Sequence, residues 1–201
     1  YQVFGKNHNA YIRNLEDSTV VQLTFDGTLE FSYMTGWGDV KEEVPLAPVW
    51  FEDSKNFYLF RQNSHKVAEI SNLKGRPLAY NTQAVLTGDS IVLYDEISLF
   101  DVETKTQKKI KIDKWQDQLT RVLHSDTKNN KLFLERRTRR NNILEVCDVN
   151  LKTGDVKVII HEEGDPYIGI ELASIHFINN YNDIIWWSER SGYGHFYHYD
   201  R

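Results

Sequence analysis

One strand pattern recurs along this chain, and its spacing constrains the fold more than any other feature of the sequence. Each copy reads as a strand, a turn, a strand ending in Arg, a second turn, and a strand that ends near Asp. The closing residues are Asp101, Asp148 and Asp200, which lie 47 and 52 residues apart. Asn14 precedes Asp101 by 87 residues, which leaves room for two steps. A four-strand unit with a period of roughly 40–50 residues is typical of a β-propeller blade.

The clearest hairpin lies in the last copy of this unit. Residues 184–187 form an apolar and aromatic strand, residues 188–194 turn with two glycines available for positive φ, and residues 195–200 return. β-branched and aromatic residues on both arms favour a pleated, packed surface. Weaker hairpins recur upstream, so the pattern predicts an all-β chain. In three copies the strand before the second turn carries an arginine, at Arg61, Arg136 and Arg190.

At this period the chain holds about four blades, whereas propellers have roughly 4–8. We therefore predict a partial β-propeller, an arc of a larger one, with residues 1–201 in a single propeller domain. An irregular β-sandwich with coincidental spacing is the alternative. Residues 67–70 are expected to pair with the strand at residues 57–61, and residues 75–90 to be a long connection. The best helix candidate, residues 114–119, is too short to be stable by itself.

Composition excludes several classes of function. The net charge is −5, so the chain lacks the overall basic surface expected of a nucleic-acid-binding protein. No apolar run approaches the roughly 20 residues that a membrane-spanning helix needs. Cys147 is the only cysteine, which excludes an intramolecular disulfide and a cysteine-based zinc site. The alternating pattern around Cys147 predicts a small hydrophobic side chain that is buried or half-buried. The chain starts at Tyr1 rather than Met, and we expect a piece of a longer protein.

The sequence contains no recognisable catalytic constellation. It lacks the Gly-x-Ser-x-Gly nucleophile elbow of an α/β-hydrolase, and its seven histidines have no triad context. His195 and His198 would point to opposite faces of a strand, so no metal site is expected there. The basic cluster at residues 136–140 would divide between the two faces of a hairpin and form a solvated or ion-paired turn. We predict no catalytic residue, no metal and no cofactor, and we expect this chain to be inactive alone.

Four motifs carry a family resemblance. Residues 9–12 and 22–27 read NAYI and QLTFDG, residues 48–55 read PVWFEDSK, residues 98–105 read SLFDVETK, and residues 187–197 read WSERSGYGHFY. In this order they resemble N-L-Y-V with L-T-x-D-G, W-S-P-D-S-K, L-x-x-F-D-V-x-T and x-S-E-R-x-G-Y-x-H-L-Y. These motifs belong to the N-terminal β-propeller region of the dipeptidyl peptidase IV family of serine exopeptidases. The last match is the most specific.

The resemblance implies a parent enzyme with an eight-bladed propeller followed by an α/β-hydrolase domain that carries Ser, Asp and His. The propeller would gate the site for short peptide ends, and the enzyme would release N-terminal dipeptides. The implied partners are a peptide substrate, the chain's own C-terminal hydrolase domain and a second copy in a homodimer. A periplasmic, extracellular or membrane-associated location is also implied. The alternative is a stand-alone β-propeller that binds a protein or glycan without catalysis.

Glu42 and Glu43 are the candidate substrate-binding residues. In the family, a Glu-Glu pair in a propeller insertion binds the free α-amino group of the substrate, and these two glutamates occupy the corresponding place between the second and third motif segments. Two carboxylates can hold one ammonium by charge-assisted hydrogen bonds, and the cation relieves their mutual repulsion. The sequence departs from the family at Lys41, where an acid is common, and in a shorter stretch from Glu43 to Trp50. Solvated loop glutamates are the alternative.

Overall fold

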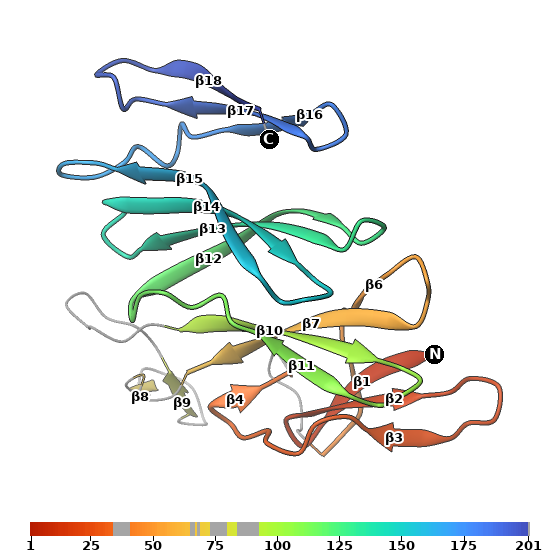
Figure 1. Cartoon of the computed structure of the whole chain (residues 1–201). Helices are drawn as coiled ribbons and strands as arrows, with labels where there is room; N and C mark the ends of the chain where they lie inside the picture. Colours follow the sequence, from red (N-terminus) through yellow and green to blue (C-terminus); the bar gives the residue numbers. More distant parts are fainter. Residues whose placement is uncertain (34–40, 65–66, 68, 73–79, 84–92, 201) are drawn as a thin grey trace.

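The computed structural model describes residues 1–200 apart from 34–40, 65–66, 68, 73–79 and 84–92. All regular elements of the described residues are β-strands, and they form successive antiparallel sheets from the N-terminus to the C-terminus (Figure 1). Within that part of the chain, the structure has no helix long and apolar enough to cross a membrane.

The first sheet has the strand order β3-β2-β1-β5. Its strands are β1 (Gln2–Lys6), β2 (Asn9–Arg13), β3 (Val20–Gln22) and β5 (Val44–Pro45). The sequence pattern predicted β2 and β3 but not β1. The tight turn between β1 and β2 places Asn7 and His8 at positive φ.

The second sheet has the order β11-β10-β7-β4, and β6 pairs with the first half of β7. Its strands are β4 (Phe31–Ser32), β6 (Val49–Trp50), β7 (Asn56–Asn63), β10 (Tyr94–Asp101) and β11 (Gln107–Ile110). The predicted pairing of residues 67–70 with this sheet is wrong, because β10 covers one edge of β7 while β4 and β6 cover the other. Instead, β8 (Glu69–Asn72) pairs with β9 (Tyr80–Gln83) in a separate hairpin. That hairpin interrupts the predicted long connection at residues 75–90, most of which lies outside the described residues.

The third sheet is a four-strand meander in sequence order. Its strands are β12 (Gln118–Asp126), β13 (Lys131–Thr138), β14 (Ile143–Asn150) and β15 (Val156–Glu163). Residues 114–119, judged too short for a stable helix, form a turn that leads into β12. The side chain of Gln118 closes the turn: it accepts a hydrogen bond from the Lys114 N–H at 2.9 Å and donates one to the Ile112 carbonyl at 3.3 Å.

The fourth sheet contains the hairpin predicted from the sequence. It has three strands, β16 (Ile175–Ile178), β17 (Asp183–Ser188) and β18 (His195–Asp200). Trp187 pairs with Phe196, and Ser188 pairs with His195 at the turn. The predicted strand, turn and return are therefore confirmed.

The repeat is real, and the structure corrects its register in the third sheet. Asp101 pairs with the first residue of β7 and Asp200 with the first residue of β17, but Asp148 pairs with the third residue of β13. The residue opposite the first position of β13 is Asn150. The carboxylate of Asp101 accepts hydrogen bonds from the backbone N–H groups two and three positions on, each at 2.8 Å, and the Asn150 side chain does the same at 2.9 and 3.0 Å. Asp and Asn both suit this turn chemistry, and a search for Asp alone selects the wrong position.

The arginine marker needs a similar correction. Arg61 and Arg136 are the sixth residues of β7 and β13. The sixth residue of β17 is Ser188, and Arg190 lies in the turn beyond that strand. The three arginines are therefore not equivalent, and only the first two share a place in their sheets.

The hydrophobic core lies between successive sheets. Phe57 and Leu59 of β7 pack against the first sheet, whereas Tyr58, between them in sequence, packs against the third. This alternation follows from the two-residue period of a strand. A third cluster joins Leu144 of the third sheet to Trp186 of the fourth. Because the second and third sheets are each covered on both faces, the arrangement is a stack of propeller blades and not a two-layer sandwich.

Cys147 is fully buried in the cluster between the second and third sheets. Burial raises the pKa of its thiol to about 11. A protonated, enclosed thiol is inert, so the prediction of a buried hydrophobic cysteine is confirmed.

Candidate functional site

The connections β1–β2, β7–β10, β13–β14 and β17–β18 all lie along one side of the stack of sheets, at the left in Figure 1, which we name the insertion face. It carries residues 7–8, the β8–β9 hairpin, residues 139–142 and residues 189–194 (Figure 1). The opposite face carries the turns capped by Asp101 and Asn150.

Glu42 and Glu43 lie at the insertion face, because they directly precede β5, whose Val44 pairs with Gly5 near the end of β1. Both glutamates are exposed. The structure brings Glu43 to Arg13, whose Nη2 donates to Glu43 Oε2 at 2.7 Å. Glu42 has no ion-pair partner among the described residues. The short stretch from Glu43 to Trp50 contains no helix.

Arg13 is itself held in place. Its guanidinium lies 4.9 Å from the centroid of the Phe4 ring, and its Nη1 donates to Gln2 Oε1 at 3.1 Å. A guanidinium fixed over an aromatic ring loses little further freedom when it binds a carboxylate. Arg13 therefore fixes one oxygen of Glu43 and leaves the other available.

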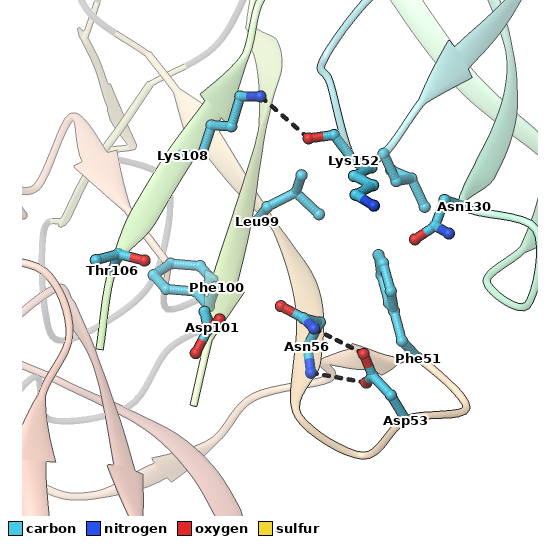
Figure 2. Close-up of a pocket in the computed structure, with 11 residues that line it drawn as sticks. Phe51, Asp53, Asn56, Leu99, Phe100, Asp101, Thr106, Lys108, Asn130 and Lys152 are labelled. Atoms are coloured by element: carbon cyan, nitrogen blue, oxygen red, sulfur yellow. Dashed lines mark hydrogen bonds between the residues drawn. The ribbon is translucent and has the colours of Figure 1, made fainter. Parts of the chain in front are cut away.

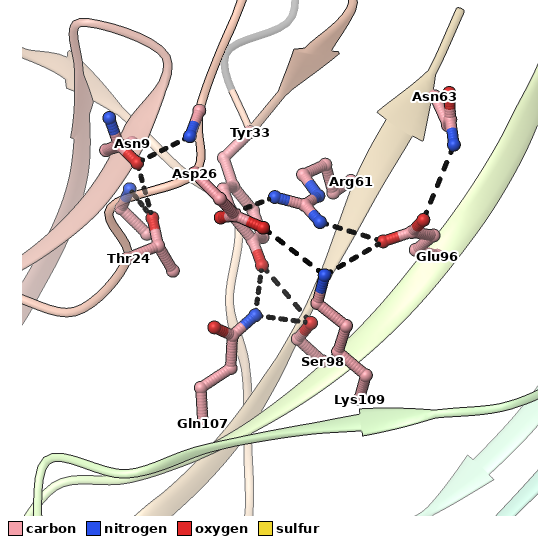
Figure 3. A network of polar contacts seen from close by, with 12 residues as sticks. Asn9, Thr24, Asp26, Tyr33, Arg61, Asn63, Glu96, Ser98, Gln107 and Lys109 are labelled. Carbon is pink, nitrogen blue, oxygen red and sulfur yellow. Dashed lines mark hydrogen bonds and ion pairs between the residues drawn. The ribbon is translucent and has the colours of Figure 1, made fainter. Parts of the chain in front are cut away.

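The two segments of the first family motif, residues 9–12 and 22–27, are joined by side-chain hydrogen bonds. Asn9 Oδ1 accepts from the Thr24 hydroxyl at 3.1 Å and from the Gly27 N–H at 2.9 Å, and the Thr24 hydroxyl oxygen accepts from the Ala10 N–H at 2.9 Å (Figure 3). A Cβ on Gly27 would lie 2.5 Å from the His8 carbonyl oxygen, so this position excludes any larger residue. The motif residues thus hold the loop after β3 against the β1–β2 turn.

The loop after β3 places Asp26 beside the buried Arg61. The Arg61 side chain is fully buried, and its two Nη atoms donate to Asp26 at 2.8 Å and to Glu96 at 2.9 Å (Figure 3). Its guanidinium lies 4.4 Å from the centroid of the Phe31 ring, and Lys109 Nζ lies 3.3 Å from Asp26. Burial opposes ionisation of Asp26, but Arg61 and Lys109 outweigh it, and the pKa of this carboxyl lies below its usual value. Sequence reasoning noticed Arg61 and Asp26 in separate motifs but not their pairing.

A neutral hydrogen-bond group borders this ionic cluster. The Tyr33 hydroxyl donates to Ser98 Oγ at 3.2 Å, and Gln107 Nε2 donates to both oxygens at 2.9 Å (Figure 3). Burial raises the pKa of Tyr33. A buried tyrosine with a raised pKa stays neutral, and its hydrogen bonds join Tyr33 to the second sheet.

The third sheet has a second ionic cluster, centred on Glu145. Arg136 donates to Glu145 Oε2 at 2.8 Å through Nε and to the Ile112 carbonyl at 3.0 Å through Nη1. Lys114 Nζ lies 2.5 Å and His161 Nδ1 3.0 Å from Glu145 Oε1. Burial opposes ionisation of Glu145, but its three basic partners outweigh it and lower its pKa. The sequence offered no sign of this convergence, because the partners lie on separate strands and a turn.

The basic cluster at residues 136–140 divides as the strand alternation predicted. Arg136 is buried against Glu145. Arg137, its neighbour in sequence, pairs with Glu135 on the other side of the strand. These arginines serve ion pairs within the fold.

A cleft of about 440 Å³ opens between the second and third sheets on the opposite face. Figure 2 shows Lys108 reaching across it to Lys152, whose carbonyl accepts a hydrogen bond from Lys108 Nζ at 3.2 Å. The same Nζ also donates to the Thr153 carbonyl at 2.6 Å. Asp53 on the cleft wall is engaged by the backbone N–H groups and the side chain of its own turn. The polar groups of this cleft therefore join the two sheets and cap turns.

His195 and His198 lie on β18, where strand alternation directs them to opposite faces of the sheet, and His198 Nε2 lies 3.4 Å from Asp183. Among the described residues, no group of three His, Cys, Asp or Glu side chains could hold a metal ion.

Antiparallel sheets that stack face to face and repeat one turn chemistry define this chain as a set of β-propeller blades. The family described as "Dipeptidyl peptidase IV (DPP IV) N-terminal region" matches residues 1–201. The chain therefore belongs to this family, and the resemblance inferred from the four motifs is confirmed.

Individual relatives agree with this assignment. Probable dipeptidyl-aminopeptidase B of Botryotinia fuckeliana (strain B05.10) is 39% identical over 70 residues, and that of Sclerotinia sclerotiorum (strain ATCC 18683 / 1980 / Ss-1) is 37% identical over 70 residues. Each match covers 33% of this chain and 8% of the relative. This chain therefore corresponds to a small part of these relatives.

Solved structures show the same fold. The crystal structure of Porphyromonas gingivalis dipeptidyl peptidase 4 superposes with a TM-score of 0.70 at 20% identity, over 99% of this chain and 29% of that chain. A putative dipeptidyl aminopeptidase IV from Bacteroides ovatus ATCC 8483 superposes with a TM-score of 0.60 at 15% identity, over 98% of this chain and 33% of that chain.

Proposed function

We propose that this chain is the substrate-gating propeller portion of a serine exopeptidase that releases N-terminal dipeptides from peptides. The observation that carries the proposal is the family match over residues 1–201. The names of the fungal and bacterial relatives, which are dipeptidyl peptidases and aminopeptidases, support it. In this proposal the nucleophile, its base and the oxyanion hole come from an α/β-hydrolase domain of the parent protein, which packs against the propeller. A homodimer is a further part of the proposal.

Glu42 and Glu43 bind the free α-amino group of the peptide in this proposal. Their position at the insertion face and their exposure support it. Arg13 holds Glu43 Oε2 at 2.7 Å, so a substrate ammonium would bind the free Oε1, and Glu42 would supply the second carboxylate. Each ammonium–carboxylate contact is a charge-assisted hydrogen bond.

The experiment measures kcat/KM of the full-length parent on a substrate with a free amino terminus. Glu42→Gln and Glu43→Gln should each lower kcat/KM roughly ten- to a hundred-fold, because a hydrogen bond to a charged group contributes about 1.5–3 kcal/mol and a decade corresponds to about 1.4 kcal/mol. Both variants should keep the melting temperature of the wild type, since both side chains are exposed.

Glu16→Gln is the matched control, because Glu16 is equally exposed but lies in the β2–β3 turn on the opposite face. Substrates with a blocked amino terminus should be poor for the wild type and should not discriminate it from the variants. Wild-type kcat/KM in both variants on the free-amino substrate would place the clamp elsewhere.

A further inference from the structure

We infer that the cleft between the third and fourth sheets binds the basic side chain of a peptide, arginine in preference to lysine. The peptide nature of the ligand rests on the proposed function, whereas the cation preference rests on the cleft itself. The cleft has a volume of about 450 Å³, within the range of roughly 300–1,000 Å³ typical of small-ligand sites. It is lined by the end of β15, the connection that follows it and the β17–β18 turn, so it opens at the insertion face.

The lining is strongly acidic. It contains the carboxylates of Glu162, Glu163, Asp165 and Glu189, and Arg190 is its one basic residue. Arg190 is engaged by aromatic side chains: its guanidinium lies 3.6 Å from the centroid of the Tyr197 ring. Within the described part of the chain, the carboxylates of Asp165 and Glu189 have no hydrogen-bond or ion-pair partner. Glu163 pairs with His161 at 3.0 Å, so the excess negative charge of the cleft lies on Asp165 and Glu189.

Glu162 gives this cleft a buried acidic anchor. Its side chain is 4% exposed, and its Oε1 accepts a hydrogen bond from Trp186 Nε1 at 2.8 Å. The nearest cationic atom, Arg190 Nη1, lies 3.9 Å away, beyond hydrogen-bond distance. Among the described residues, Oε2 of Glu162 has no donor. Arg190 therefore forms a long ion pair with Oε1, and Oε2 stays open to a cationic donor on a ligand in the cleft.

The walls are shaped by glycines and aromatic rings. A Cβ on Gly169 would lie 3.1 Å from Glu189 Oε2, and one on Gly194 would lie 2.6 Å from the ring of Trp187. Both glycines therefore leave room for the side chains that border the cleft. Trp187 and the exposed Tyr167 line it together. Aromatic faces attract cations, and a planar guanidinium can stack on a ring while it donates to carboxylates at its edge.

The ligand that fits these features is an organic cation rather than a bare metal ion. The carboxylates do not form a group that could hold a metal ion among the described residues, and the volume and the ring faces suit a larger group. Arginine offers five donors in one plane, whereas lysine offers a compact point charge. We therefore expect guanidinium to bind better than ammonium.

The test is a titration of the purified chain with Nα-acetyl-arginine amide, followed by NMR or calorimetry. Saturable binding is expected, at least about tenfold tighter than binding of Nα-acetyl-citrulline amide, which has the same shape without the charge. Nα-acetyl-lysine amide should bind with intermediate affinity. None of these probes has a free α-amino group, so the result is independent of Glu42, Glu43 and any hydrolysis.

Variants locate the binding. Glu189→Gln and Asp165→Asn should each weaken arginine-amide binding about tenfold, and both residues are exposed, so folding is not at risk. Glu171→Gln is the matched control, because Glu171 is an exposed acid of the same connection that does not line the cleft. Equal binding of the arginine and citrulline probes, wild-type affinity in both cleft variants, or saturable Ca²⁺ binding that displaces the arginine probe would each overturn the inference.

Discussion

The second and third sheets place a buried arginine at the same position but surround it in opposite ways. The sixth residue of β7 and the sixth residue of β13 are both arginines, and each lies opposite a glutamate on the next strand. Arg61 faces Glu96, and Arg136 faces Glu145. Arg61 is one cation shared by two carboxylates. Glu145 is one carboxylate shared by three basic groups.

The difference shows what the extra partner of an ion pair does in a repeated fold. The second acid on Arg61 is Asp26, which comes from the first sheet and therefore joins two blades. The extra partners of Glu145 are Lys114 and His161, which belong to the turn before β12 and to β15. The first cluster fixes one sheet against another, and the second fixes one sheet internally.

The largest expected effect is that of removing Arg61. Arg61→Leu leaves Asp26 and Glu96 facing each other with only the half-exposed Lys109 beside them. Removing the buried partner of such a pair costs about 3–5 kcal/mol. Arg136→Leu should cost less, about 1–3 kcal/mol, because Glu145 keeps Lys114 and His161. Urea unfolding of both variants at pH 7 measures the difference. Equal losses would show that the two clusters are energetically equivalent.

Removing only the Asp26–Arg61 ion pair, which joins the first and second sheets, should have a smaller effect on the free energy of unfolding. Asp26→Asn should lower the free energy of unfolding by about 1 kcal/mol at pH 7, a value reduced by the half-exposed position of this carboxylate. The pKa of Asp26 is lowered in the fold, so its contribution is present above its usual pKa and is lost as the pH falls. The difference between the wild type and the variant should therefore begin to shrink as the pH falls below about 4. A difference that stays constant as the pH falls below this value would mean that the charge of Asp26 is not responsible.

The smallest effect concerns His161 and has the opposite pH dependence. The pKa of His161 is raised, first by its hydrogen bond to Glu163 and then, against the opposing effect of burial, by its bond to Glu145. Its contribution is therefore fully present below its usual pKa and is lost as the pH rises through the raised value. Because the imidazole is partly exposed, His161→Gln should cost less than about 1 kcal/mol at pH 5.5 and nothing measurable at pH 9. Urea midpoints at the two pH values test this, and a loss of equal size at both would exclude a role for the imidazolium.

The same two clusters show what could be read from the sequence. Strand alternation and turn residues predicted the all-β class and the hairpin of β17 and β18. The repeat also pointed to Arg61 and Arg136. The partners of Arg61 could not be predicted, because Asp26 and Glu96 each lie 35 residues away and meet it only when two sheets pack and a register is set. Asp148 was chosen over Asn150 because the sequence shows residue types and not which amide groups a side chain can reach.

The candidate sites divide in the same way. Glu42 and Glu43 were found from their place between two motifs, and the structure adds Arg13, which no motif includes. The acidic cleft between the third and fourth sheets has no sequence signature, because its carboxylates come from a strand end, a connection and a turn.

The second and third sheets each contribute to two hydrophobic clusters, one on each face, and this affects how the region unfolds. A sheet with a core on each face cannot separate from one neighbour without exposing apolar surface on both, so opening should spread from blade to blade as in other stacked architectures. The boundary that holds Cys147 should open last, because both of its sheets have a core on each face. Cooperative unfolding of this region then depends on the contacts between neighbouring sheets. The ion pair of Arg61 with Asp26 is a polar contact of this kind between the first and second sheets.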